Sequence, residues 1–173
     1  MTTPFPDTEK LLNNLIERIR GNIKPDTGII GIHTGGVWVA ERLHAALGSQ
    51  VPLGTIDIAF YRDDYSQRGL HGNVKPSDIP FDVNGRDIIL VDDVLYTGRT
   101  IRAAMNELFD YGRPGCVMLA ALVDRGGRQL PIEPRFVGAE VSVPDDKLVS
   151  LRRNEDGVLH LSTKPRPTAY DQP

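Results

Sequence analysis

Apolar side chains in the first fifty residues are spaced as in a helix, a strand and a second helix. Residues 10–20 predict an amphipathic helix, because their apolar positions recur every three or four residues. These positions are Leu11, Leu12, Leu15, Ile16 and Ile19, and the expected cap is Asp7 or Thr8. Residues 28–32 are a short apolar run, typical of a strand buried in a parallel sheet. A glycine turn then opens a helix predicted over residues 37–47, and the turn is Thr34, Gly35 and Gly36.

The rest of the chain continues this alternation. Residues 51–61 have the pattern of an extended segment, and residues 87–91, 116–123 and 135–141 are typical of strands. Residues 100–111 predict a helix whose inner face holds Ile101, Met105, Leu108 and Phe109. Residues 147–151 and 158–161 indicate a closing pair of strands. The order predicts an α/β fold with a mostly parallel twisted sheet flanked by helices and right-handed crossovers.

Length and loop composition predict the domain organisation. The 173 residues suit one domain, expected over residues 1–163. Residues 62–85 are charged and interrupted by glycine and proline. This stretch is too long for an ordinary connection, so it is either a functional lid or a disordered excursion. Residues 164–173 have little to pack and are predicted to be a disordered tail.

The amino-acid composition restricts the cellular compartment and the classes of partner that we expect for this protein. The single cysteine, Cys116, lies in an apolar run, so we expect a small buried residue in a reducing compartment. No apolar run approaches the roughly 20 residues that cross a bilayer, which predicts a cytoplasmic protein with no membrane partner. A net charge of -3 gives no global attraction for nucleic acid. The histidines have no metal-ligand spacing, so an imidazole metal site is not expected; they are His33, His44, His71 and His160.

Candidate chemistry is concentrated after the strand predicted at residues 87–91. Ligands of parallel sheets bind beyond the carboxyl ends of the strands, where Asp92 and Asp93 follow. The two carboxylates could accept hydrogen bonds from vicinal ribose hydroxyls, although an aspartate pair that only caps the next helix is the plain alternative. The following residues offer backbone N–H groups, a glycine and two hydroxyls to a phosphate. They are Val94, Leu95, Tyr96, Thr97, Gly98, Arg99 and Thr100.

The whole segment 89–100 resembles a known signature. Its sequence, Ile-Leu-Val-Asp-Asp-Val-Leu-Tyr-Thr-Gly-Arg-Thr, is similar to the 5-phosphoribosyl-1-pyrophosphate (PRPP) motif of type I phosphoribosyltransferases. The Val-Leu-Tyr-Thr-Gly-Arg-Thr version resembles the PyrR family, bifunctional pyrimidine operon regulators with uracil phosphoribosyltransferase activity. Residues 31–37 are similar to the family's pyrophosphate loop, 57–64 to the start of its lid and 122–132 to a later signature. The resemblance implies the type I phosphoribosyltransferase fold, with a small hood and a flexible lid.

The resemblance also implies roles for individual residues. The reaction would convert uracil and PRPP to UMP and pyrophosphate, with Mg²⁺ as electrophile. Asp92 and Asp93 would take part in catalysis and in binding the metal. Arg62, in the lid, would also be catalytic. Pyrophosphate would meet backbone N–H groups of Thr34, Gly35 and Gly36. The base would be held by Val123, Asp124, Arg125, Phe136 and Val137.

Several readings of substrate and partner stay open. Hypoxanthine-guanine phosphoribosyltransferases hold Asp at the position of Tyr96 and Lys at that of Asp124, so this chain favours a pyrimidine over a purine. An RNA-binding attenuator that senses UMP, UTP or PRPP is the rival, with candidate contacts Arg20, Arg125 and Arg128 to pyrimidine operon leader RNA. Relatives commonly carry Arg at the position of Gly35, and its absence could weaken PRPP binding. Family members form homodimers or larger assemblies, so at least a dimer is expected.

Overall fold

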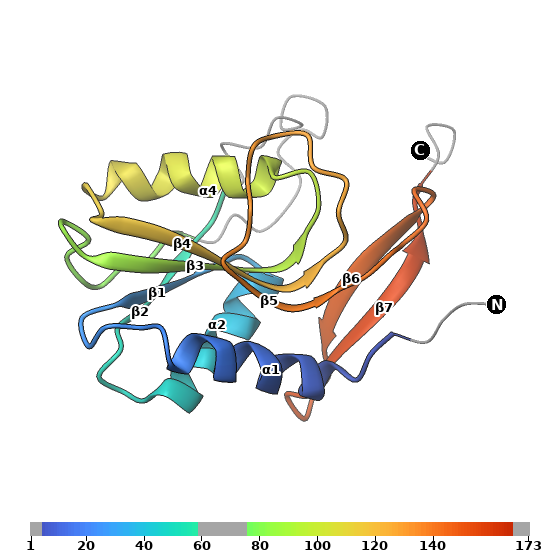
Figure 1. Ribbon diagram of the computed structural model, residues 1–173, viewed down its shortest axis with the longest axis horizontal. Helices are drawn as coiled ribbons and strands as arrows, with labels where there is room; N and C mark the ends of the chain where they lie inside the picture. Colours follow the sequence, from blue (N-terminus) through green and yellow to red (C-terminus); the bar gives the residue numbers. More distant parts are fainter. Residues whose placement is uncertain (1–4, 59–75, 168–173) are drawn as a thin grey trace.

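A five-stranded parallel sheet forms the centre of the molecule (Figure 1). The computed structural model describes residues 5–58 and 76–167. The strand order is β2-β1-β3-β4-β5, and every neighbouring pair is parallel. The strands are β1 (Gly28–Ile32), β2 (Leu53–Ile56), β3 (Asp87–Leu95), β4 (Cys116–Asp124) and β5 (Phe136–Glu140). The predicted α/β class is confirmed.

Helices cover both faces of the sheet. Helices α1 (Thr8–Arg20) and α2 (Gly35–Leu47) lie on one face, and α4 (Arg99–Asp110) lies on the other (Figure 1). Because successive side chains of a strand point to opposite faces, each strand supplies two apolar cores. Ile29 and Val91 join the core under α1 and α2, whereas Ile30 and Leu90 join the core under α4. The continuous apolar runs of the sequence therefore mark strands that are buried on both sides.

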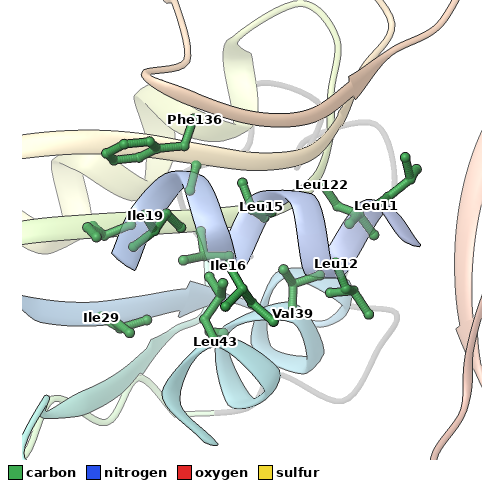
Figure 2. Packing of buried hydrophobic residues seen from close by; sticks show 14 of the residues in the cluster. Leu11, Leu12, Leu15, Ile16, Ile19, Ile29, Val39, Leu43, Leu122 and Phe136 are labelled. Carbon is green, nitrogen blue, oxygen red and sulfur yellow. The ribbon is translucent and has the colours of Figure 1, made fainter. Parts of the chain in front are cut away.

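The first helix matches its predicted pattern closely. Its five apolar residues are all buried and point toward the sheet and α2 (Figure 2). Asp7 is the N-cap, and its side chain accepts a hydrogen bond of 2.9 Å from the backbone N–H of Glu9. Arg42 of α2 forms a bidentate pair with Glu9, which joins the two helices on the solvent side.

An antiparallel hairpin stands beside the sheet. It consists of β6 (Lys147–Arg153) and β7 (Leu159–Pro165), and we refer to it as the hood. Leu151 and Leu159 are buried in the core under α1, and the backbone N–H of Leu161 donates to Thr8 Oγ1 at 3.1 Å. The predicted closing pair is thus confirmed, with longer strands than expected. β7 extends through Pro165, so the segment predicted as a tail begins inside a strand.

Two predictions of burial, those for Phe109 and Cys116, were wrong. Phe109 is 51% exposed, because it follows the buried Leu108 on the solvent side of α4. Cys116 is exposed, because it is the first residue of β4 and lies at the amino end of that strand. Residues 76–85, the described part of the predicted lid, pack on the sheet: Thr55 and Asp78 form a bridge and Val83 is buried. In the part of the chain with described structure, no helix is long and apolar enough to span a bilayer.

Candidate functional site

The strand order places a ligand site between β1 and β3. After β1 the chain passes through α2 to β2 on one side, whereas β3 is followed by α4 and β4 on the other. In an open parallel sheet, such a reversal leaves a crevice beyond the carboxyl ends of the two strands. β3 continues four residues beyond Val91, the last residue of its pairing with β1. The end of β3 therefore forms one wall of that crevice.

A pocket of about 420 Å³ occupies this position. Its walls come from the segment after β1, the end of β3, the start of α4, the loop after β4 and strand β6 of the hood. The lining residues are His33, Thr34, Gly35, Asp92, Asp93, Val94, Tyr96, Thr100, Arg125, Leu148 and Val149. Segments that are far apart in the sequence thus meet at the switch point of the sheet. Two of the three residues predicted for the pyrophosphate loop line the pocket, and the third, Gly36, packs against the backbone of β3.

The two aspartates both reach the pocket from β3, not from a loop as predicted. Asp92 is 6% exposed, and its Oδ1 accepts a hydrogen bond of 2.9 Å from the N–H of Asp93. Asp93 lies against Gly35: a Cβ atom at position 35 would be 2.5 Å from Asp93 Cγ. A side chain at position 35 would therefore displace this carboxylate. The space beside Gly35, where the resemblance led us to expect an Arg in relatives, is occupied by the Asp93 carboxylate of β3.

The predicted phosphate segment divides into strand and turn. Val94 and Leu95 pair with β4, so the turn consists of Tyr96, Thr97 and Gly98 before α4 begins at Arg99. Gly98 has a positive φ of 91°, which glycine adopts without strain. The hydroxyl oxygen of Thr97 accepts a hydrogen bond of 3.2 Å from the N–H of Arg99.

Contacts from the loop after β4 orient the peptide groups of this turn. The N–H of Arg125 donates to Leu95 O at 3.0 Å, and those of Gln129 and Leu130 donate to Thr97 O. In a trans peptide the carbonyl and the following N–H point in opposite directions. The N–H groups that follow these carbonyls, in Tyr96 and Gly98, therefore point away from residues 125–130. Together with the N-terminus of α4, they form a surface suited to an anion.

Arg125 closes the other end of the pocket. It is 8% exposed, and its guanidinium lies 4.1 Å from the centre of the Tyr96 ring. Its two terminal nitrogens donate to Lys147 O at 2.9 Å and Pro144 O at 3.4 Å, where the chain enters the hood. One buried side chain thus joins the turn after β3 to the hood. Tyr96, Arg125, Leu148 and Val149 thus form one wall of the pocket, with an aromatic ring stacked on a guanidinium beside two aliphatic side chains.

Most residues predicted to hold the base lie elsewhere. Val123 and Phe136 are buried in the core, and Phe136 packs over the end of α1 that carries Ile19 (Figure 2). Val137 is on β5 and does not line the pocket. Asp124 borders an adjacent hollow of about 470 Å³ with Glu140 and Ser142. Of the five predicted residues, only Arg125 lines the main pocket.

Asp124, the last residue of β4, pairs with an arginine of the loop that follows. Its Oδ2 pairs with Arg128 at 2.5 Å and its Oδ1 accepts from the N–H of Gly126 at 2.9 Å. Burial raises the pKa of Asp124, but the hydrogen bonds from Arg128 and Gly126 outweigh burial and leave the pKa below its ordinary value. Asp124 is therefore charged at neutral pH and serves the loop instead of a base.

The candidate RNA contacts differ in accessibility. The guanidinium groups of Arg125 and Arg128 both donate to backbone carbonyls. Arg20 is exposed, pairs with Glu17 and also donates to Ala46 O. Arg62, the predicted lid cation, lies outside the described residues. The hood residues Leu148 and Val149 were missed, because only the tertiary fold brings β6 to the pocket.

Comparison with known proteins agrees with this geometry. Residues 4–147 match the model of the phosphoribosyl transferase domain. A protein named bifunctional protein PyrR from Pseudomonas savastanoi pv. phaseolicola is 48% identical over 161 residues, covering 91% of this chain and 95% of that protein. Its namesake from Pseudomonas entomophila is 59% identical over 151 residues, covering 85% and 88%. The chain belongs to the PyrR family of phosphoribosyltransferases. The family predicted from residues 89–100 is thereby confirmed.

Solved structures place the PyrR fold among its relatives. A hypoxanthine-guanine phosphoribosyltransferase from Bacillus anthracis superposes with a TM-score of 0.64 at 18% identity, covering 82% of this chain and 85% of the other. A purine phosphoribosyltransferase from Pyrococcus horikoshii gives a TM-score of 0.59 at 29% identity, covering 77% and 82%. These likenesses show the type I phosphoribosyltransferase fold, and a fold alone does not determine which base an enzyme takes.

Proposed function

We propose that this PyrR-family chain is a uracil phosphoribosyltransferase that forms UMP and pyrophosphate from uracil and PRPP. The observation that carries the proposal is the pocket between β1 and β3, which is lined by Asp92 and Asp93 together with the turn that follows β3. Asp92 and Asp93 would accept hydrogen bonds from the two ribose hydroxyls. The turn of Tyr96, Thr97 and Gly98, with the start of α4, would hold the 5′-phosphate.

Transfer from PRPP develops positive charge on the ribose and negative charge on the departing pyrophosphate. The carboxylates of Asp92 and Asp93 border the pocket where the ribose would lie, so they would stabilise the positive ring. Thr34 and Gly35 precede the bulk of α2, whose N-terminal dipole favours an anion. Pyrophosphate would therefore leave toward this helix. Arg62 remains a proposed contributor from the segment outside the described residues.

The donor set of the pocket fits a magnesium ion that is shared with the substrate. Among the described residues, no group of three or more His, Cys, Asp or Glu side chains could hold a metal. Mg²⁺ commonly uses one or two protein carboxylates together with water and substrate phosphates, and Asp92 and Asp93 would supply them. Bound there, Mg²⁺ would offset the charge of the leaving pyrophosphate.

The base end of the pocket supports a pyrimidine. Uracil would lie against the wall of Tyr96, Arg125, Leu148 and Val149. The position that holds a lysine in hypoxanthine-guanine enzymes is Asp124, which is tied to Arg128 and offers no cation to a purine oxygen. Turnover of hypoxanthine instead of uracil remains the purine alternative.

Regulation through RNA binding is the rival function for this chain. The word bifunctional in the names of the relatives supports it as a second candidate. Steady-state turnover with uracil, PRPP and Mg²⁺ tests the enzyme, with hypoxanthine and cytosine as parallel substrates. Tight, UMP-dependent binding of a pyrimidine leader hairpin without turnover would favour the regulator and refute the enzyme. Sedimentation velocity would test the expected dimer.

A further inference from the structure

Among the three carbonyls that orient the phosphate turn, one is held differently from the others. Leu95 O and Thr97 O accept from backbone N–H groups, which any residue could provide. Tyr96 O accepts instead from a side chain, Arg128 Nη1, at 2.8 Å. The Tyr96–Thr97 peptide is thus the one member of this set whose orientation depends on the identity of a single residue.

Arg128 is fixed in place by all three of its nitrogens. Nη2 pairs with Asp124 Oδ2 at 2.5 Å, and Nε donates to Ile132 O at 2.8 Å. The side chain of Arg128 is 23% exposed and that of Asp124 is 12% exposed, so the pair is largely removed from solvent. A planar guanidinium held at three points has little freedom to rotate. The hydrogen bond from its Nη1–H therefore keeps Tyr96 O directed toward the loop after β4.

The orientation of this carbonyl fixes a donor on the other side of the turn. With Tyr96 O directed at Arg128, the N–H of Thr97 points away from residues 125–130, like the N–H groups of Tyr96 and Gly98. Three successive N–H groups then face the same side, the arrangement that binds a phosphate. Without the hydrogen bond from Arg128, the Tyr96–Thr97 peptide can rotate and direct its carbonyl at the phosphate site, where the carbonyl would repel an anion.

The geometry points to Arg128, supported by Asp124, as a positioning residue that sets the Thr97 N–H for the 5′-phosphate of the substrate. This inference rests on the proposed function, since it needs a ribose 5-phosphate ligand in the pocket. It assigns Arg128, a candidate RNA contact in the sequence, to the active site, without contact to the substrate.

The test compares Arg128→Gln and Arg128→Lys with the control Arg113→Gln. Arg113 is exposed and precedes β4, at the opposite end of the strand from the pocket. Isothermal titration would measure binding of ribose 5-phosphate, UMP and uridine, which lacks the phosphate. We expect both Arg128 variants to bind ribose 5-phosphate and UMP on the order of 10- to 100-fold more weakly, the effect of one hydrogen bond to a charged group. Uridine binding should change by less than about 3-fold.

A lysine keeps the charge but cannot reach three acceptors, so Arg128→Lys separates orientation from electrostatic attraction. Asp124→Asn gives the same test in a milder form if both Arg128 variants fail to fold. Affinities for ribose 5-phosphate and UMP equal to those of the control, or an equal loss for uridine, would overturn the inference and leave the proposed function intact. Failure of the unmodified protein to bind UMP and ribose 5-phosphate would refute both.

Discussion

Two adjacent glycines, Gly35 and Gly36, should respond in opposite ways to the same substitution. A Cβ at position 35 would meet the carboxylate of Asp93, a side chain that can rotate away. A Cβ at position 36 would press on Val91 O and lie 3.1 Å from Asp92 Cα, which are backbone atoms of a central strand. Gly35→Ala should therefore displace a ligand group, whereas Gly36→Ala should strain the sheet.

The magnitudes follow from these contacts. Neither glycine has a positive φ, so alanine gains about 0.4–1 kcal/mol through the unfolded chain at both positions. At Gly35 a reoriented Asp93 costs about the same, on the order of 0.5–1.5 kcal/mol, and stability should stay within about 1 kcal/mol. At Gly36 overpacking costs about 1–3 kcal/mol or more, which for a domain of this size lowers Tm by roughly 3–10 °C.

Gly35→Ala, the variant with the smaller loss of stability, should have the larger loss of affinity for UMP. Loss of the Asp93 carboxylate from the ribose hydroxyls should weaken UMP binding by about 1.5–3 kcal/mol, or roughly 10- to 100-fold, in Gly35→Ala. Thermal unfolding followed by circular dichroism and titration calorimetry with UMP would measure both quantities on the same samples. A Gly35→Ala variant that binds UMP normally, or that melts as low as Gly36→Ala, would refute the reasoning.

Further predictions concern the carboxylates, the core and pH. Asp92→Asn and Asp93→Asn should each weaken PRPP binding by about 10-fold or more with the fold retained; unchanged steady-state kinetics would count against the site. Ile19→Ala should cost about 2–5 kcal/mol in urea unfolding, because Ile19 is fully buried under the sheet; a loss below 1 kcal/mol would contradict this packing. The lowered pKa of Asp124 means that its pair with Arg128 contributes fully above its ordinary pKa near 3.9 and is lost as the pH falls through the lower folded value. Unfolding curves between pH 5 and pH 2 should therefore show a steeper acid loss of stability in the unmodified protein than in Asp124→Asn, and parallel curves would exclude this role.

The sequence predicted the architecture well because its strands are buried on both faces. Continuous runs such as residues 28–32 and 87–91 leave little choice of element, and glycine turns mark their ends. The end of β3 was placed too early, because the charged Asp92 and Asp93 resemble a loop in a single sequence. In the structure they extend past β1, where a strand end can carry polar groups into a crevice.

The site was harder to predict where it depends on tertiary contacts. Phe136 has the same apolar character whether it faces a base or α1, and only packing decides between them. Leu148 and Val149 look like ordinary strand residues until the hood brings them to the pocket. The engagement of Arg128 with Tyr96 O likewise has no local signature, because the two residues belong to loops after different strands.

The pocket takes walls from the first, middle and last thirds of the chain, so a ligand can bind only after the whole domain has folded. A ligand at one hundred times its dissociation constant then adds about 2.7 kcal/mol to the free energy of unfolding, enough to raise Tm by roughly 5–10 °C. Melting curves with nucleotides that differ only in the base would rank their affinities without any turnover assay. In a cell, the same linkage would make resistance of the protein to proteolysis depend on the size of its nucleotide pool.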